Sequence, residues 1–168
     1  TLNDMIRRMD AKSGVVLLRF LATASDLNEF NAFSSALAKV KEKLDYEQLL
    51  KLRNEFGERR KDDVLSSISS KAIEQFGLEG ALHKTSSDAE MHRYVMGHIS
   101  IMDPSFYLDL SRLSQDCRED PDFMSTLLNS MANKIPKEGE QFVQQLADPP
   151  AAARFVFWRM SIDSQSVS

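Results

Sequence analysis

The stretch from Leu27 to Leu44, LNEFNAFSSALAKVKEKL, decides the fold class, because its apolar residues recur every three or four positions. That spacing places them on one face of an α-helix. Ser25 and Asp26 come just before it and are residue types that cap helix N-termini. The sequence therefore predicts a helix here, forming an antiparallel hairpin with a second helix that starts after Asp45.

The segment before this helix, from Val15 to Ala24, is almost continuously apolar. Continuous apolarity is typical of a helix buried on most of its sides or of a buried strand. Since no second strand candidate occurs along the chain, we expect a helix. The three- and four-residue spacing of apolar residues from Leu2 to Met9 predicts a shorter helix at the start of the chain.

Beyond the hairpin, apolar residues at helical spacing predict a helix from Leu65 to Phe76, with a connector from Leu78 to Thr85. The charged segment from Gly57 to Asp63, GERRKDD, has no apolar residue, so we expect a loop rather than a turn of a longer helix. Together with Arg53 and Glu55 it has four positive and four negative side chains. That balance indicates a salt-bridged exposed turn and not a phosphate-binding patch.

Helix-start signals divide the rest of the chain. Ser87, with Glu90 three residues later, has the pattern of a capping box and predicts a helix that ends near Met102. Asp-Pro occurs three times, at Asp103, Asp120 and Asp148. Because aspartate caps a helix and proline is favoured at its first position, these pairs predict helices near 104–116, 121–134 and 149–161, with another near 138–147.

These elements predict an all-α fold, an irregular bundle of about seven to nine mostly short helices. We expect one helical domain over residues 1–160, followed by a flexible polar tail over 161–168. Hydrophobic content of 42% and charged content of 27% in 168 residues are ordinary for a globular chain. The longest apolar stretches are too short for a transmembrane segment.

Charge and cysteine content narrow the expected partners and compartment. The formal net charge of −4 disfavours nucleic acid as a partner and gives no overall attraction to anionic membranes, although local patches are compatible with it. The single cysteine, Cys117, cannot form an intramolecular disulfide and weakly favours a reducing compartment such as the cytoplasm.

No motif for a metal, a bound phosphate or a catalytic nucleophile stands out, so we expect no cofactor and no metal. Asp88 and His92 are four residues apart, but they lack the further ligands that a metal site needs. The alternative to a non-enzyme is an all-α enzyme or small-ligand-binding protein whose polar groups converge only in three dimensions. Its expected contributors are Asp88, His92, Tyr94, His83 and His98.

The segment from Ala151 to Met160, AAARFVFWRM, is the most unusual in the chain. One face of a helix cannot bury all its apolar residues, so the helix either lies centrally in the bundle or forms a contact surface. We therefore expect a helical interaction, adaptor or regulatory module that binds another protein or another domain of the same protein. The expected partner-binding residues are Arg154, Phe157, Trp158 and Met160.

Overall fold

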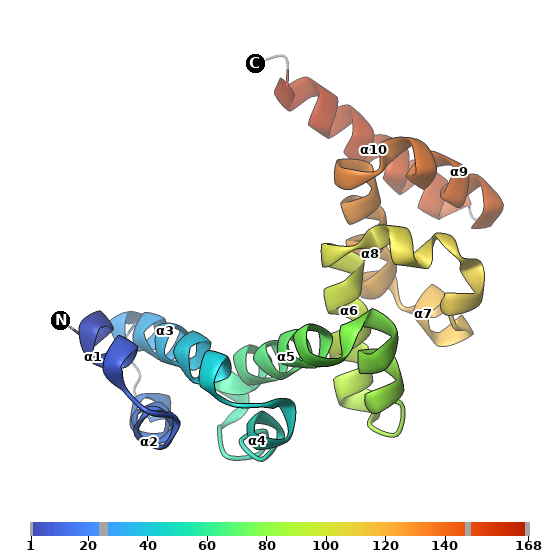
Figure 1. Ribbon diagram of the computed structural model, residues 1–168. Helices are drawn as coiled ribbons and strands as arrows, with labels where there is room; N and C mark the ends of the chain where they lie inside the picture. The colour runs from blue at the N-terminus through green and yellow to red at the C-terminus, as the bar shows by residue number, and fades with distance from the viewer. Residues whose placement is uncertain (1, 24–26, 147–148, 167–168) are drawn as a thin grey trace. The chain divides into compact units, whose positions relative to one another are not determined.

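The computed structural model describes residues 2–23, 27–146 and 149–166 (Figure 1). These residues form ten α-helices and two 3₁₀ helices, with no strand among them. The all-α, irregular architecture predicted from the sequence is confirmed, and the number of helices is slightly above the predicted range. Contacts divide the chain into two compact units, unit 1 from Thr1 to Val95 and unit 2 from Met96 to Ser168. Whether residues 1–160 behave as one domain stays a prediction.

In unit 1, α2 packs against α3, and α5 packs against both α3 and α4. The predicted helix is present as α3, and Asp45 caps α4 through a capping box with Gln48. The predicted antiparallel hairpin is wrong, because α3 packs on α2 and α5, whereas the short α4 packs on α5. The residues predicted to cap α3, Ser25 and Asp26, lie outside the described residues. The helices of unit 1 are α1 (Leu2–Arg8), α2 (Ala11–Ala22), α3 (Leu27–Lys43), α4 (Tyr46–Leu50), α5 (Glu58–Lys84) and the first part of α6 (Ala89–Met102).

The loop predicted from Gly57 to Asp63 is wrong, because α5 already begins at Glu58 with Gly57 as its N-cap residue. Arg60 explains the difference. Its side chain is buried, and its guanidinium lies over the Phe33 ring at 4.8 Å from the ring centroid. Arg60 can occupy a core position because its methylene stem is apolar and its guanidinium stacks on an aromatic ring. The sequence pattern treats it as a polar residue, so only the tertiary structure shows that it is buried.

The predicted connector from Leu78 to Thr85 is also helical up to Lys84. A single residue, Gly77, interrupts α5 with φ 75° and ψ 176°, a backbone conformation that is essentially restricted to glycine. The next helix, α6, is capped by Asp88, whose carboxylate accepts the Met91 N–H at 3.2 Å. The capping box predicted from Ser87 is therefore one residue out of place.

The α2 helix corrects a further expectation, because it is not buried on most of its sides. Leu18 and Leu21 are buried, whereas Val16 and Phe20 on the other side of the helix are exposed. No helix in the described ranges is long and apolar enough to cross a membrane.

In unit 2, α8 contacts α7, α9 and α10, and α9 contacts α10. The buried core is aromatic at one end, where the Tyr107 ring stacks edge-on against Phe106 at 5.3 Å and Phe123 at 5.5 Å. The remaining helices are η1 (Pro104–Leu108), η2 (Leu110–Arg112), α7 (Gln115–Glu119), α8 (Pro121–Lys134), α9 (Pro136–Leu146) and α10 (Pro149–Ser166).

The three Asp-Pro pairs do not behave alike. Asp120 caps α8 as predicted, accepting the N–H groups of Asp122 and Phe123 at 3.0 and 3.2 Å. Asp103 instead accepts the Ser105 hydroxyl, and the helix predicted over 104–116 is replaced by two 3₁₀ turns and the short α7. Asp148 lies outside the described residues. The helix predicted to end near Ser161 continues to Ser166 as α10.

Candidate functional site

Helix α10 packs on α8 and α9 through one side, and that contact depends on a glycine. Phe155 is 3% exposed, and its ring lies against Gly139 of α9. A Cβ atom at Gly139 would lie 2.8 Å from Phe155 Cε2, which is closer than real Cβ contacts. Only the absence of a side chain at Gly139 lets the aromatic ring approach the α9 backbone so closely.

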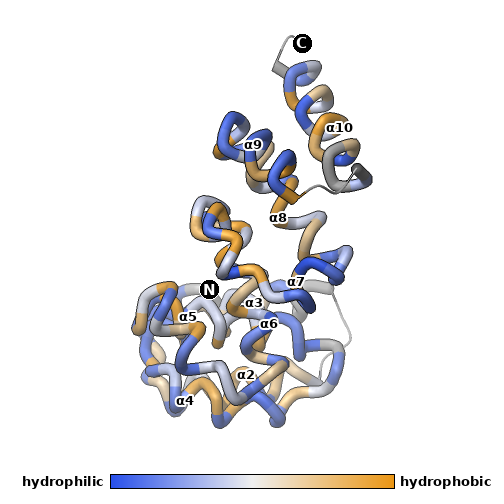
Figure 2. Tube along the Cα trace, turned by 90° about the vertical axis from the view of Figure 1, so that its right-hand side faces the viewer, coloured by the Kyte–Doolittle hydropathy of each residue, from blue (hydrophilic) through white to orange (hydrophobic). Residues whose placement is uncertain are grey.

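The other side of α10 is apolar but exposed. Val156, Phe157 and Met160 are 55%, 68% and 67% exposed. Because residues three and four apart share a helix face, Met160 lies on the same face as both Val156 and Phe157. Figure 2 shows hydrophobic and hydrophilic residues alternating along this helix. We call Val156, Phe157 and Met160 the α10 face.

The four predicted partner-binding residues do not all lie on this face. Phe157 and Met160 belong to it, and the exposed Arg154 lies one turn before Phe157 at its edge. Trp158 is half-buried and turns toward the packed side. The sequence analysis missed Val156, because apolar residues occur all around this helix and their spacing does not show which of them are covered.

Charged groups border the α10 face toward its carboxyl end. Arg159 Nη2 lies 3.6 Å from Asp163 Oδ1, and Arg159 Nη1 donates to the Ala132 carbonyl oxygen of α8 at 3.5 Å. Arg159 therefore contacts both α8 and its own helix. This leaves Arg154 as the more exposed of the two arginines next to the apolar side chains.

The residues expected for an enzyme or ligand-binding site lie mostly in unit 1, where Asp88, His92 and Tyr94 contact other side chains. Arg53 forms ion pairs with Asp88 and, at 2.7 Å, with Glu90, which also lies 3.1 Å from Lys61. The hydrogen bonds from Arg53 hold the pKa of the Asp88 and Glu90 carboxyl groups below their ordinary values. These contacts join the start of α6 to α5 and to the segment after α4.

Tyr94 and His92 also bond to neighbouring side chains. The Tyr94 hydroxyl donates to Asp62, and burial together with this bond raises the pKa of Tyr94 to about 12. Because the Thr85 hydroxyl donates to the Ala81 carbonyl oxygen at 2.8 Å, it accepts from His92 Nδ1 at 3.1 Å. His83 is exposed, and His98 lies in unit 2.

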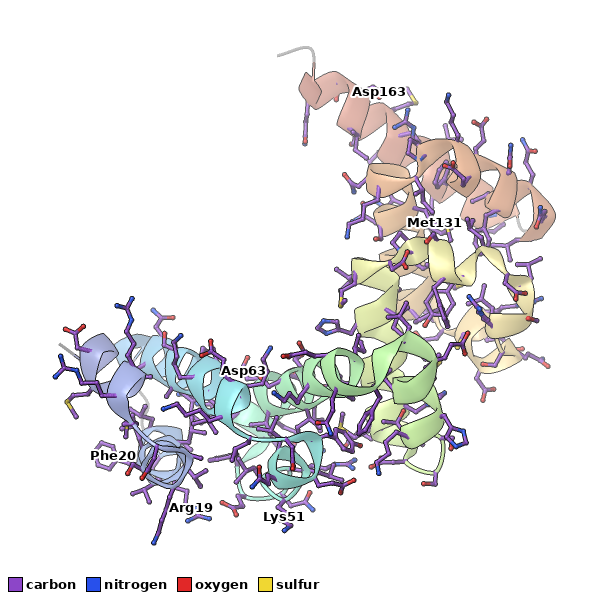
Figure 3. The ribbon with its side chains drawn as sticks, viewed as in Figure 1. Arg19, Phe20, Lys51, Asp63, Met131 and Asp163 are labelled. Atoms are coloured by element: carbon purple, nitrogen blue, oxygen red, sulfur yellow. The ribbon has the colours of Figure 1, made fainter. Side chains whose placement is uncertain are left out.

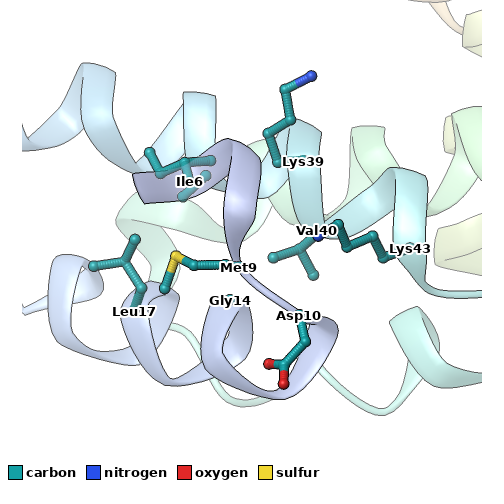
Figure 4. Close-up of a pocket in the computed structure, with 9 residues that line it drawn as sticks. Ile6, Met9, Asp10, Gly14, Leu17, Lys39, Val40 and Lys43 are labelled. Atoms are coloured by element: carbon teal, nitrogen blue, oxygen red, sulfur yellow. The ribbon is translucent and has the colours of Figure 1, made fainter. Parts of the chain in front are cut away.

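Neither of two pockets in unit 1 brings these residues together. The first is a void of about 10 Å³ between α1, α2 and α3, enough for roughly one water molecule (Figure 4). The second is an open groove of about 360 Å³ with mostly charged walls, lined by Glu42, Lys43, Leu44, Asp45, Lys71, Glu74 and Gln75.

The cysteine and the potential metal ligands give no candidate site either. The buried Cys117 accepts the Ser114 hydroxyl through its Sγ at 3.2 Å and lies 3.4 Å from Met96 Sδ. No group of three or more potential metal ligands occurs within the described ranges. The α10 face is therefore the strongest candidate site in unit 2. We found no family model, no curated protein and no solved structure that matches this chain.

Proposed function

We propose that this chain is a helical interaction module, adaptor or regulatory in role and non-catalytic, that binds another protein or another domain of the same protein through the α10 face. The observation behind this proposal is that Val156, Phe157 and Met160 are each more than half exposed on a helix whose opposite side packs on α8 and α9 and buries Phe155. Apolar side chains that cluster on a surface favour association, because covering them removes their area from water.

The composition of the surface also favours a protein partner. Aromatic residues, methionine and arginine are enriched at the centres of protein interfaces, and Phe157, Met160 and Arg154 are of these three kinds. Because α10 is held on α8 and α9 by Phe155, its outer side chains are presented on an ordered helix. Less conformational entropy is then lost on binding than if the segment had to fold first.

The test is a comparison of two exposed phenylalanines. Phe157→Glu, on the α10 face, should lose a partner captured from native lysate by the wild-type chain, because a carboxylate would be buried in the contact. Phe20→Glu is the matched control, since Phe20 is 70% exposed on α2 in unit 1 and should keep the partner.

Circular dichroism of both variants should match the wild type, because neither side chain is part of a core. Equal capture by Phe157→Glu and the wild type, or loss of capture only in Phe20→Glu, would contradict the proposal.

A further inference from the structure

Helix α2 of unit 1 has one side packed and one side open. Its packed side approaches α3 so closely that a Cβ atom at Gly14 would lie 2.6 Å from Val40 Cγ2. Its outward side has two large apolar residues one turn apart, Val16 at 58% and Phe20 at 70% exposed. Figure 3 shows the side chains of Phe20 and Arg19 extending outward from this helix.

The open side of α2 is cationic as well as apolar. The helix has two basic residues, Lys12 and Arg19, and no acidic residue. Lys12 lies one turn before Val16 and is exposed, as are Arg7 and Arg8 of the preceding helix α1. Arg19 forms two hydrogen bonds with Glu55, at 2.7 and 3.0 Å.

No ion pair joins Lys12, Arg7 or Arg8 to any residue that the structure describes. The exposed apolar residues Val16 and Phe20 thus share α2 with the exposed Lys12, and two further exposed cations lie on the preceding helix α1.

We propose that the outward side of α2 docks on an anionic lipid bilayer. Val16 and Phe20 would enter the boundary between headgroups and acyl chains, while Lys12 and the arginines of α1 would meet anionic headgroups. This surface is distinct from the α10 face, and docking on a bilayer is a role beyond the proposed function.

Charge favours an anionic bilayer as the occupant of this side. Both charged residues of α2, Lys12 and Arg19, are basic, and the helix has no acidic residue. A bilayer needs no matching shape and gains from each inserted apolar group and from each nearby cation separately.

The test is flotation of the full chain with phosphatidylcholine vesicles, with and without about 30% phosphatidylserine. We expect binding to the anionic vesicles only, weakened by about tenfold when salt is raised from about 0.05 M to 0.5 M. Phe20→Ser should weaken binding by about tenfold, since it removes the more exposed apolar group. Lys12→Glu should also weaken it, through charge.

The matched control is Phe157→Ser on α10, which should bind vesicles as the wild type does. Equal binding to both vesicle types, or no binding at about 1 mM anionic lipid, would overturn the proposal. Binding that depends on Lys12 but not on Phe20 would also overturn it and would indicate an acidic protein or a nucleic acid. Circular dichroism confirms that each variant is folded.

Discussion

Gly77 is the residue at which α5 changes direction, with φ 75° and ψ 176°. Any other residue is strained in this conformation, so Gly77→Ala should lower the free energy of unfolding by about 1–3 kcal/mol. Gly97 is the control, because it lies inside α6 and a Cβ atom there would meet nothing within 4 Å. Gly97→Ala should raise stability by up to about 1 kcal/mol. Urea unfolding measures the change in the free energy of unfolding of each variant, and we expect the two changes to have opposite signs. Changes of the same sign would contradict the strain assigned to position 77.

Gly139 is required for lack of space around it, and not for its backbone conformation. A methyl group there would contact the Phe155 ring at 2.8 and 2.9 Å and Met131 Cβ at 3.0 Å. We expect Gly139→Ala to lower the free energy of unfolding by about 1–3 kcal/mol through this overpacking. Phe155→Leu should relieve part of the clash, so the double variant should lose less stability than the sum of the single variants. Strict additivity in urea unfolding would show that Gly139 and Phe155 do not interact.

At the scale of elements, Arg53 holds the start of α6 through Asp88 and Glu90. Both carboxyl groups have a folded-state pKa below their ordinary values of 3.8 and 4.5. Their stabilising effect is therefore complete above about pH 5 and is lost as the pH falls through the lowered folded-state pKa values. Arg53→Met should destabilise the chain at neutral pH, and the difference from wild type should shrink below about pH 4.

Urea unfolding between about pH 7 and pH 3 measures this difference. The control is Lys39→Met, which removes only an exposed pair with Glu42 at 3.2 Å and should change stability little. A difference between Arg53→Met and wild type that stays constant with pH would show that the two carboxylates do not mediate the effect of Arg53.

The elements that the sequence predicts well are those whose signals are local. Helix α8 runs from Pro121 to Lys134 as expected, because Asp120 caps it and an amphipathic pattern fills it. The start of α5 could not be predicted from local pattern, since Arg60 is buried by contact with Phe33, 27 residues earlier in the sequence. At Asp103 the local signal was present but misleading, because its side chain accepts the Ser105 hydroxyl and does not cap a helix N-terminus.

The candidate site was predictable only in part, for a related reason. Composition alone identifies α10 as having more apolar side chains than one face can bury. Which of them are covered depends on where Gly139 admits the Phe155 ring, and this contact joins two helices. Once Phe155 is packed, the helix period places Phe157 and Met160 outside, whereas Trp158 is half-buried.

At the scale of the whole molecule, each unit has a buried core of its own. Unit 1 buries Phe33, Leu49 and Ile68, and unit 2 buries Tyr107, Leu127 and Phe142, each of them nearly inaccessible to solvent. A strained residue in one unit should therefore destabilise mainly that unit.

Hydrogen exchange of the two glycine variants tests this independence. We expect Gly77→Ala to increase amide exchange in α3 and α5 and to leave α8 to α10 unchanged, because its strain lies in α5 of unit 1. Gly139→Ala should do the reverse, because the clash with Phe155 and Met131 lies within unit 2. If either variant increases exchange throughout the chain, the two cores unfold together, and residues 1–160 behave as the single domain predicted from the sequence.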